Sequence, residues 1–239
     1  MKINFEKIIN NSLITLGVIA IFMILIIGSF STLVFYKGFY YSEYHKNNVY
    51  KSLVTNNYSE NVSNSQMLAE DVTNNLVSYM RGKSELKYFS QEEKSHLRDV
   101  KFIISGINFI YYSSVVIFLL ILIIFYYKFK SNMGFVEKLS KMVLYGSITS
   151  LTFIVAILLL IIFFFQELFL LMHVILFPQG NWMFDQTSLL ITLFPNQFFI
   201  NFGLRIFIYA LFQSIIFLII GIWLRKHVTL QKKFKTKIN

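Results

Sequence analysis

The chain has 239 residues, of which 56% are hydrophobic, and it carries a formal net charge of +10 at pH 7. Its mean hydropathy of +0.59 lies outside the usual range of soluble proteins. Cysteine is absent, which excludes disulfides, a thiol nucleophile and thiolate metal sites.

Four apolar runs are each long enough for a helix that crosses a bilayer, which takes about 20 residues. They cover residues 13–36, 103–127, 142–165 and 202–224. The first follows a short basic start, as a signal peptide would, but it is too long for the usual apolar core of such a peptide, so we interpret it as a retained span. The sequence therefore predicts an all-α membrane protein with four transmembrane helices, in which residues 1–239 form a single membrane domain.

The charged residues are unevenly distributed along the chain. Residues 1–12, 128–141 and 225–239 hold twelve Lys or Arg and two acidic residues, whereas the remainder holds ten of each kind. Because positive residues beside spans mark the cytoplasmic side, we expect both termini and the loop 128–141 inside. Residues 37–102 and 166–201 then lie outside, as a small exoplasmic subdomain and an interfacial segment. We interpret the basic tail 225–237 as a topology anchor with affinity for anionic lipid, not as a nucleic-acid site.

The exoplasmic loop 37–102 begins with a polar, tyrosine-rich stretch. Residues 39–50 are compatible with a short strand or hairpin. Leu68, Val72, Leu76 and Met80 recur every four residues, which predicts an amphipathic helix that residues 81–83 end. The loop by itself is too short and too polar to bury a sizeable core, so a solvated spacer is the alternative.

Residues 90–93, Ser-Gln-Glu-Glu, form a capping box that predicts a helix running on into the second span. On this helix Glu92, His96 and Asp99 have i, i+4 and i+3 spacings and therefore share one face. A carboxylate beside an imidazole fixes its tautomer and raises its basicity. The alternative is a surface ion-pair cluster of the kind common at helix starts.

The apolar stretch 170–199 is broken by His173, by the run 178–182 of sequence PQGNW, and by Asp185 and Pro195. Backbone that leaves a helix inside hydrocarbon must satisfy its own hydrogen bonds, so such a break lies at the membrane surface or lines a cavity. On a straight helix His173 falls about 12–16 Å beyond the third span, and His96 precedes the second span by about 10 Å. Both imidazoles are thus expected at the outer interface, although His173 is also compatible with a plain interfacial anchor.

Three chemistries are open to such a pair of histidines. The first is acyl transfer with histidine as base, the second a zinc site that includes Asp99 or Glu92, and the third a proton-sensitive gate. The spacing matches no zinc motif, and no span carries a charge near its centre, which argues against transport. We expect neither a metal nor a cofactor.

Two segments together resemble one known family. Residues 90–101, SQEEKSHLRDVK, are similar to its E-x-x-H-hydrophobic-x-D-V motif. Residues 172–199 are similar to a second motif with histidine, W-x-F-D and a final P-x-x-F-F. The family is that of the bacterial lipoprotein intramolecular transacylases (Lit), and the four-span plan agrees with it. In the family's pattern an acid often stands where this chain has Ser188 and Asn196.

The resemblance implies an enzyme of the bacterial cell membrane that acts at the exoplasmic face. It would move the sn-2 acyl chain of a diacylglyceryl group, carried on a lipoprotein's N-terminal cysteine, to the α-amino group of that cysteine. It also implies that His96 and His173 are catalytic and that diacylated lipoproteins are the partners. We expect a monomer. The alternative function is a four-span scaffold or sensor whose exoplasmic loop binds a partner.

The two histidines are expected to divide the work. Glu92 and Asp99 would hold the pKa of His96 near or above its ordinary value, which suits a general base. His173 has apolar neighbours in sequence, and burial would keep it neutral, which suits a donor to the ester oxygen. Trp182 and Phe184 are expected to wall the acyl or glyceryl group, and Asp185 to cap the following helix, with interfacial anchoring as the alternative for these three.

Overall fold

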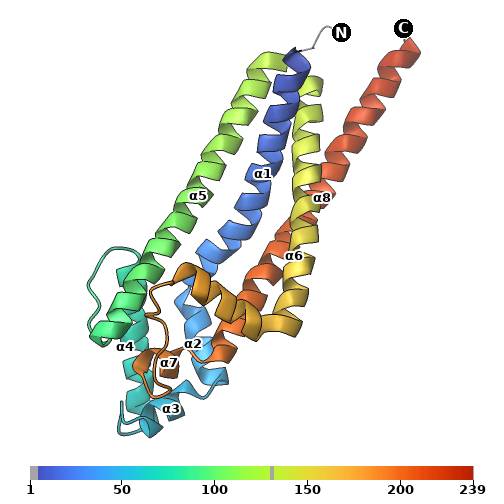
Figure 1. Cartoon of the computed structure of the whole chain (residues 1–239). Coiled ribbons are helices and arrows are strands. Elements are labelled where there is room, and N and C mark those ends of the chain that lie inside the picture. The colour runs from blue at the N-terminus through green and yellow to red at the C-terminus, as the bar shows by residue number, and fades with distance from the viewer. Residues whose placement is uncertain (1–4, 130–131, 239) are drawn as a thin grey trace. The chain divides into compact units, whose positions relative to one another are not determined.

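The computed structural model describes residues 5–129 and 132–238. These residues form helices and no strand (Figure 1). The helices are α1 (Phe5–Val34), α2 (Lys37–Lys46), α3 (Val49–Thr55), α4 (Val62–Met80), α5 (Gln91–Phe129), α6 (Asn132–Leu176), α7 (Leu189–Leu193) and α8 (Asn196–Ile238).

Four of the helices, α1, α5, α6 and α8, are long and apolar enough to cross a membrane. Only 17% to 28% of the most apolar window of each is buried against protein. The remaining apolar surface needs a hydrocarbon solvent, because soluble monomers rarely expose large contiguous apolar patches. The predicted all-α fold with four membrane helices is confirmed.

The described residues divide into two compact units, which are best taken separately. The first contains the described parts of residues 1–29, 108–157 and 207–239, all from the four long helices. Its core joins Ile21 of α1, Phe125 of α5 and Met142 of α6. A Cβ on Gly221 would lie 2.9 Å from the backbone of Leu144. Helices α6 and α8 therefore approach each other closely at this glycine of α8.

The second unit contains residues 30–107 and 158–206. Helix α3 packs against both α4 and α7, and α2 packs against α3 and α4. Their shared core includes the fully buried Tyr44, Leu53, Val72 and Leu193. Residues 37–102 thus do bury a core, but they do so together with residues 189–206. This explains why the loop looked too polar to fold when it was considered by itself.

The expected strand or hairpin at 39–50 is wrong, since this stretch forms α2 and the start of α3. Tyr40 and Tyr44 are one helical turn apart, and both pack into the core beside Phe194 and Phe198. Tertiary burial therefore overrides the strand preference of these aromatic residues. Asn48, in the left-handed region at φ 55°, separates the two helices.

Two local predictions in this unit are confirmed. The amphipathic helix is α4, and Gly82 follows its end with φ +74°, a conformation that glycine adopts without strain. The capping box also forms: Ser90 N–H donates to Glu93 Oε2 at 2.8 Å, and Glu93 N–H donates to Ser90 Oγ at 3.2 Å. From there α5 continues without interruption to Phe129.

Helix α6 is not straight. Phe164 has φ −135° and ψ 32°, and the helix changes direction there, as Figure 1 shows. Residues 165–176 form the segment after this kink, and His173 lies within it. The distance of His173 from the third span, which was estimated for a straight helix, therefore does not apply, because the chain leaves helical geometry at Phe164.

Candidate active site

The site is built on the first turns of α5, whose position is fixed by Glu93. This carboxylate is 3% exposed, and besides capping α5 it accepts from Leu190 N–H at 2.7 Å. One carboxylate thus joins the first turns of α5 and α7, and the two bonded residues lie 97 positions apart in sequence. His96 follows one turn later, on the same rigid helix start.

His96 and His173 lie together in the second unit. Their rings are nearly parallel, at 17°, with centroids 6.2 Å apart, and each residue is only 8% exposed. Phe177 contacts both rings, with centroids 4.5 Å from His96 and 5.6 Å from His173. The fold therefore brings together the two histidines that the sequence singled out from distant segments.

The loop between α6 and α7, residues 177–188, covers the histidine pair. Trp182 packs on His173 with ring centroids 4.9 Å apart, and Phe184 packs on His96 at 5.6 Å. Both aromatic residues predicted to wall the site thus contact a histidine. Gly180 makes the turn that starts this loop, with φ +77°.

Asp99 anchors this loop to α5 and does not bond His96. It accepts from Gln179 Nε2 at 2.8 Å and from Asn181 Nδ2 at 2.7 Å. The sequence did not predict the roles of Gln179 and Asn181. The PQGN run indicated only a break in the apolar stretch, and its partner Asp99 lies about 80 residues away. Glu92, which shared the predicted face, is exposed.

The expected pKa of His96 is wrong. His96 and His173 both lie outside the apolar runs 103–127 and 142–165. The pKa of His96 is lowered to about 4, mainly by burial and also by the neighbouring His173, and Asp99 offsets this only in part. Asp99 is hydrogen-bonded to two side-chain amides and not to His96. It therefore affects the pKa of His96 only through its charge. His96 is therefore neutral at physiological pH.

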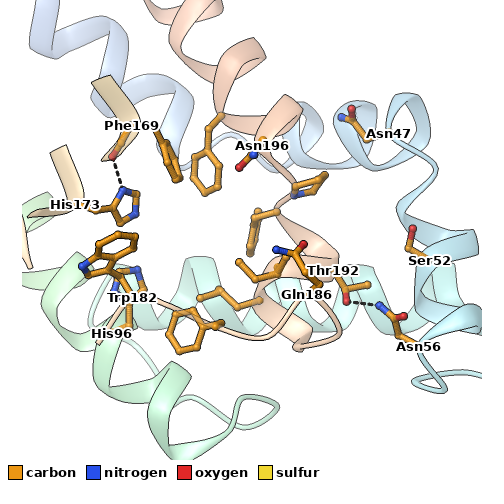
Figure 2. A pocket seen from close by; sticks show the side chains of 16 residues that line it. Asn47, Ser52, Asn56, His96, Phe169, His173, Trp182, Gln186, Thr192 and Asn196 are labelled. Carbon is orange, nitrogen blue, oxygen red and sulfur yellow. Dashed lines mark hydrogen bonds between the residues drawn. The ribbon is translucent and has the colours of Figure 1, made fainter. Parts of the chain in front are cut away.

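His173 has a defined tautomer. Its Nδ1 lies 2.7 Å from the carbonyl oxygen of Phe169, which can only accept, so Nδ1 carries the proton (Figure 2). In the neutral ring Nε2 then holds a lone pair. Burial lowers the pKa of His173, and the bond to Phe169 offsets this in part. His96 Nδ1, by contrast, is buried without a hydrogen-bond partner among the described residues.

The histidine pair borders two different cavities of the second unit. One has a volume of about 320 Å³, and polar side chains line it opposite the histidines (Figure 2). The other, of about 430 Å³, is lined almost entirely by apolar side chains, including Leu97, Ile104, Phe165 and Phe202. Only a few residues, among them His96 and His173, line both. A molecule with a polar and an apolar part can therefore present its junction to these two imidazoles.

Three further sequence positions receive structural roles. Asp185 does not cap the following helix: its Oδ1 accepts from Thr187 N–H at 2.8 Å and from the Thr187 hydroxyl at 2.6 Å, which closes a turn. Ser188 caps α7 by accepting from Ile191 N–H. Asn196 begins α8 and lines the polar cavity. Among the described residues no three His, Asp or Glu gather as a metal site would require.

Comparison with known proteins places the chain in a family. The family model for the lipoprotein intramolecular transacylase Lit matches residues 15–199. An in meso structure of the membrane integral transacylase Lit from Bacillus cereus matches with a TM-score of 0.76 and 21% identity, over 95% of this chain and 98% of that chain. A structure of the same protein in which a histidine is replaced by alanine matches with a TM-score of 0.76 and 21% identity, over 96% of this chain and 100% of that chain.

At this level of identity the solved structures show the shared fold. The comparison with curated proteins found no match. The family model, however, covers well over half of the sequence. The chain therefore belongs to the Lit family of lipoprotein intramolecular transacylases.

Proposed function

We propose that the chain moves the sn-2 acyl chain of a lipoprotein's diacylglyceryl group to the α-amino group of the same N-terminal cysteine. The observation that carries this proposal is the pair His96 and His173 at the boundary of a polar and an apolar cavity. The product is an N-acylated lyso-form lipoprotein. Diacylated bacterial lipoproteins are the substrates, presented from the cell membrane.

The two cavities match the two parts of this substrate. An acyl chain is apolar and fits the groove lined by Leu97, Ile104 and Phe165. The cysteine amine and the polypeptide are polar and fit the other cavity. The ester carbonyl lies at the junction between these parts, and so beside the imidazoles. Holding amine and ester in contact supplies much of the rate, because one molecule contains both reacting groups.

The reaction needs one proton to move from nitrogen to oxygen. The amine attacks the sn-2 ester carbonyl, a C–N bond forms, the C–O bond breaks, and the glyceryl oxygen leaves as a hydroxyl. His173 takes the proton of the attacking amine on Nε2, since its Nδ1–H already donates to Phe169. The imidazolium then returns that proton from Nε2 to the leaving oxygen.

His96 remains neutral and supplies a hydrogen bond to the ester oxygen as negative charge develops there. This assignment reverses the roles expected from sequence. It rests on two observations, namely that no carboxylate bonds His96 among the described residues and that His173 has a fixed Nδ1–H. Such a donor, on a largely buried residue, acts mainly on the transition state.

We further propose that the site faces the exoplasm and that both termini lie in the cytoplasm, from the distribution of Lys and Arg. In this arrangement residues 37–102 form the exoplasmic subdomain and residues 166–201 the interfacial segment of one membrane domain. The site then meets lipoproteins where their lipid esters lie. Conversion of an ester to an amide is downhill, so neither a cofactor nor a metal is required.

Mass spectrometry of lipoprotein N-termini tests the proposal against a scaffold or sensor role. Lipoproteins are compared from bacteria that lack an N-acylating activity, with and without expression of this chain. We expect the N-terminal cysteine to gain an amide-linked acyl chain and its glyceryl group to become mono-acylated. Unchanged diacylglyceryl cysteine with a free amine, at full expression of a folded protein, contradicts a transacylase.

A further inference from the structure

The polar cavity beside the histidines has a wall of neutral hydrogen-bonding side chains. Figure 2 shows these residues across the cavity from His96 and His173. They are Asn47, Ser52, Asn56, Gln186, Thr192 and Asn196. Apart from the two histidines, none of the described residues that line the cavity has an ionisable side chain. The wall therefore offers hydrogen bonds without a charge.

Two of these carboxamides are held so that their oxygens remain to accept hydrogen bonds. Asn47 Nδ2 donates to the Glu43 carbonyl at 2.8 Å and to Glu43 Oε2 at 3.3 Å, and both are acceptors. Asn56 Nδ2 donates at 2.8 Å to the Thr192 hydroxyl, which in turn donates to the Ser188 carbonyl. With each nitrogen committed, Asn47 Oδ1 and Asn56 Oδ1 remain as oriented acceptors.

We propose that this wall binds the polypeptide main chain of the lipoprotein immediately after its lipidated cysteine, with Asn47 and Asn56 accepting from main-chain N–H groups. The inference rests on the proposed function and adds a peptide subsite to it. The cysteine amine must reach the histidines, and the acyl chain occupies the apolar groove. The polypeptide therefore leaves along the polar side.

The uncharged lining favours a peptide main chain over the charged groups that are found at a membrane surface. A phosphate headgroup is bound through Arg, Lys or clustered N–H donors, and none of the lining residues that the structure describes is Arg or Lys. A basic side chain needs a carboxylate, and none of the described residues in the lining carries one. A peptide main chain is neutral and carries one N–H donor per residue. Recognition through it tolerates any side chain after the cysteine.

Ester-for-amide substitution in the substrate tests the subsite directly. Synthetic diacylglyceryl-cysteine peptides are compared with analogues in which the N–H of residue 2 or of residue 3 is replaced by an ester oxygen, which removes one donor with little change in shape. For the wild-type enzyme we expect one of these esters to raise KM about three- to tenfold, the effect of one net hydrogen bond, with kcat little changed.

Two enzyme variants test the same hydrogen bonds from the side of the protein. Asn47→Ala and Asn56→Ala should each raise KM for the all-amide peptide, and at least one of them should remove the penalty of an ester. Since Asn47 also bonds the end of α2, Asn56→Ala serves as the second variant if Asn47→Ala fails to fold. Asn64→Ala, an exposed position of α4 away from the cavity, is the matched control and should keep the full penalty.

The outcomes separate this inference from the proposed function. Equal KM values for amide and ester peptides with wild-type enzyme overturn the subsite, and so does a penalty that persists in both variants. Failure of the wild-type enzyme to convert the all-amide peptide contradicts the transacylase proposal instead.

Discussion

At the scale of single residues, the proposed mechanism depends on which nitrogen of each imidazole is free. The sequence identified His96 and His173 because each is a titratable group beside an apolar run, and such groups are rarely placed there without a role. The sequence did not predict the hydrogen bond from His173 to the carbonyl of Phe169, although these residues are only four positions apart. That bond depends on a side-chain conformation of His173 that the sequence does not specify.

The first prediction concerns the division of labour between the two histidines. His173→Ala should lower kcat by about 10²–10⁴-fold, because the proton acceptor is lost. His96→Gln keeps an N–H donor and should retain more activity than His96→Ala. The measurement is single-turnover acyl transfer on a synthetic lipopeptide. His45→Ala, on an exposed position of α2, should match wild type. A fully active and folded His173→Ala enzyme would assign the base elsewhere.

The second prediction follows from the lowered pKa of His96. The unfolded chain takes up a proton at this residue near pH 6.5, whereas the folded chain resists until about pH 4. Between these values the unfolded state binds more protons, so stability should fall as pH decreases from 6.5 to 4 and level off below. Thermal unfolding in detergent measures this. His96→Phe should flatten the dependence, and an unaltered slope would contradict the burial argument.

At the scale of elements, two carboxylates of α5 hold the loop 177–188 over the histidines. Asp99 binds Gln179 and Asn181 near its start, and Glu93 binds Leu190 N–H just beyond its end. The local half of this arrangement was predictable, since a capping box is visible at a spacing of three residues. The contacts with Gln179, Asn181 and Leu190 were not predictable, because a sequence does not indicate which distant amide donates to a given carboxylate.

The third prediction uses the neighbours Glu92 and Glu93 as a matched pair. Glu93→Ala leaves the buried Leu190 N–H without its acceptor, which should cost about 1–3 kcal/mol, and it also removes the acceptor of the part-buried Ser90 N–H. Glu92→Ala removes an exposed carboxylate and should change stability by less than about 0.5 kcal/mol. Comparative unfolding in detergent measures the difference. Equal losses of stability in the two variants would contradict the role of Glu93 in joining α5 to α7.

At the scale of the whole molecule, composition and hydropathy were enough to predict four membrane helices. The small helices α2, α3 and α7 were not predictable in the same way. Each is short, and their core forms only when residues 37–102 meet residues 189–206. The tyrosines of α2 favour strands in isolation, and their helical form depends on that burial. Periodicity predicted α4 correctly because Leu68, Val72, Leu76 and Met80 all lie in or against the core of the second unit.

The fourth prediction is the topology of the chain in the membrane. Reporter fusions after Tyr58 and Gln186 should report an exoplasmic location, and fusions after Met133 and Asn239 a cytoplasmic one. The physical reason is the excess of Lys and Arg beside the expected cytoplasmic ends of the spans. A cytoplasmic signal at Gln186 would contradict a site facing the outer leaflet, because residue 186 lines the same cavity as both histidines.

The most direct test of the central claim is a crossover experiment with purified enzyme. Two diacylglyceryl-cysteine peptides are mixed, one with a deuterated sn-2 acyl chain and the other with an isotope-labelled polypeptide. Transfer within one molecule predicts N-acylated products that keep the label pattern of each substrate, at normal rates for wild type and strongly reduced rates for His173→Ala. Products that combine the deuterated acyl chain with the labelled polypeptide, or acyl chains that stay on the glyceryl group, would contradict the account.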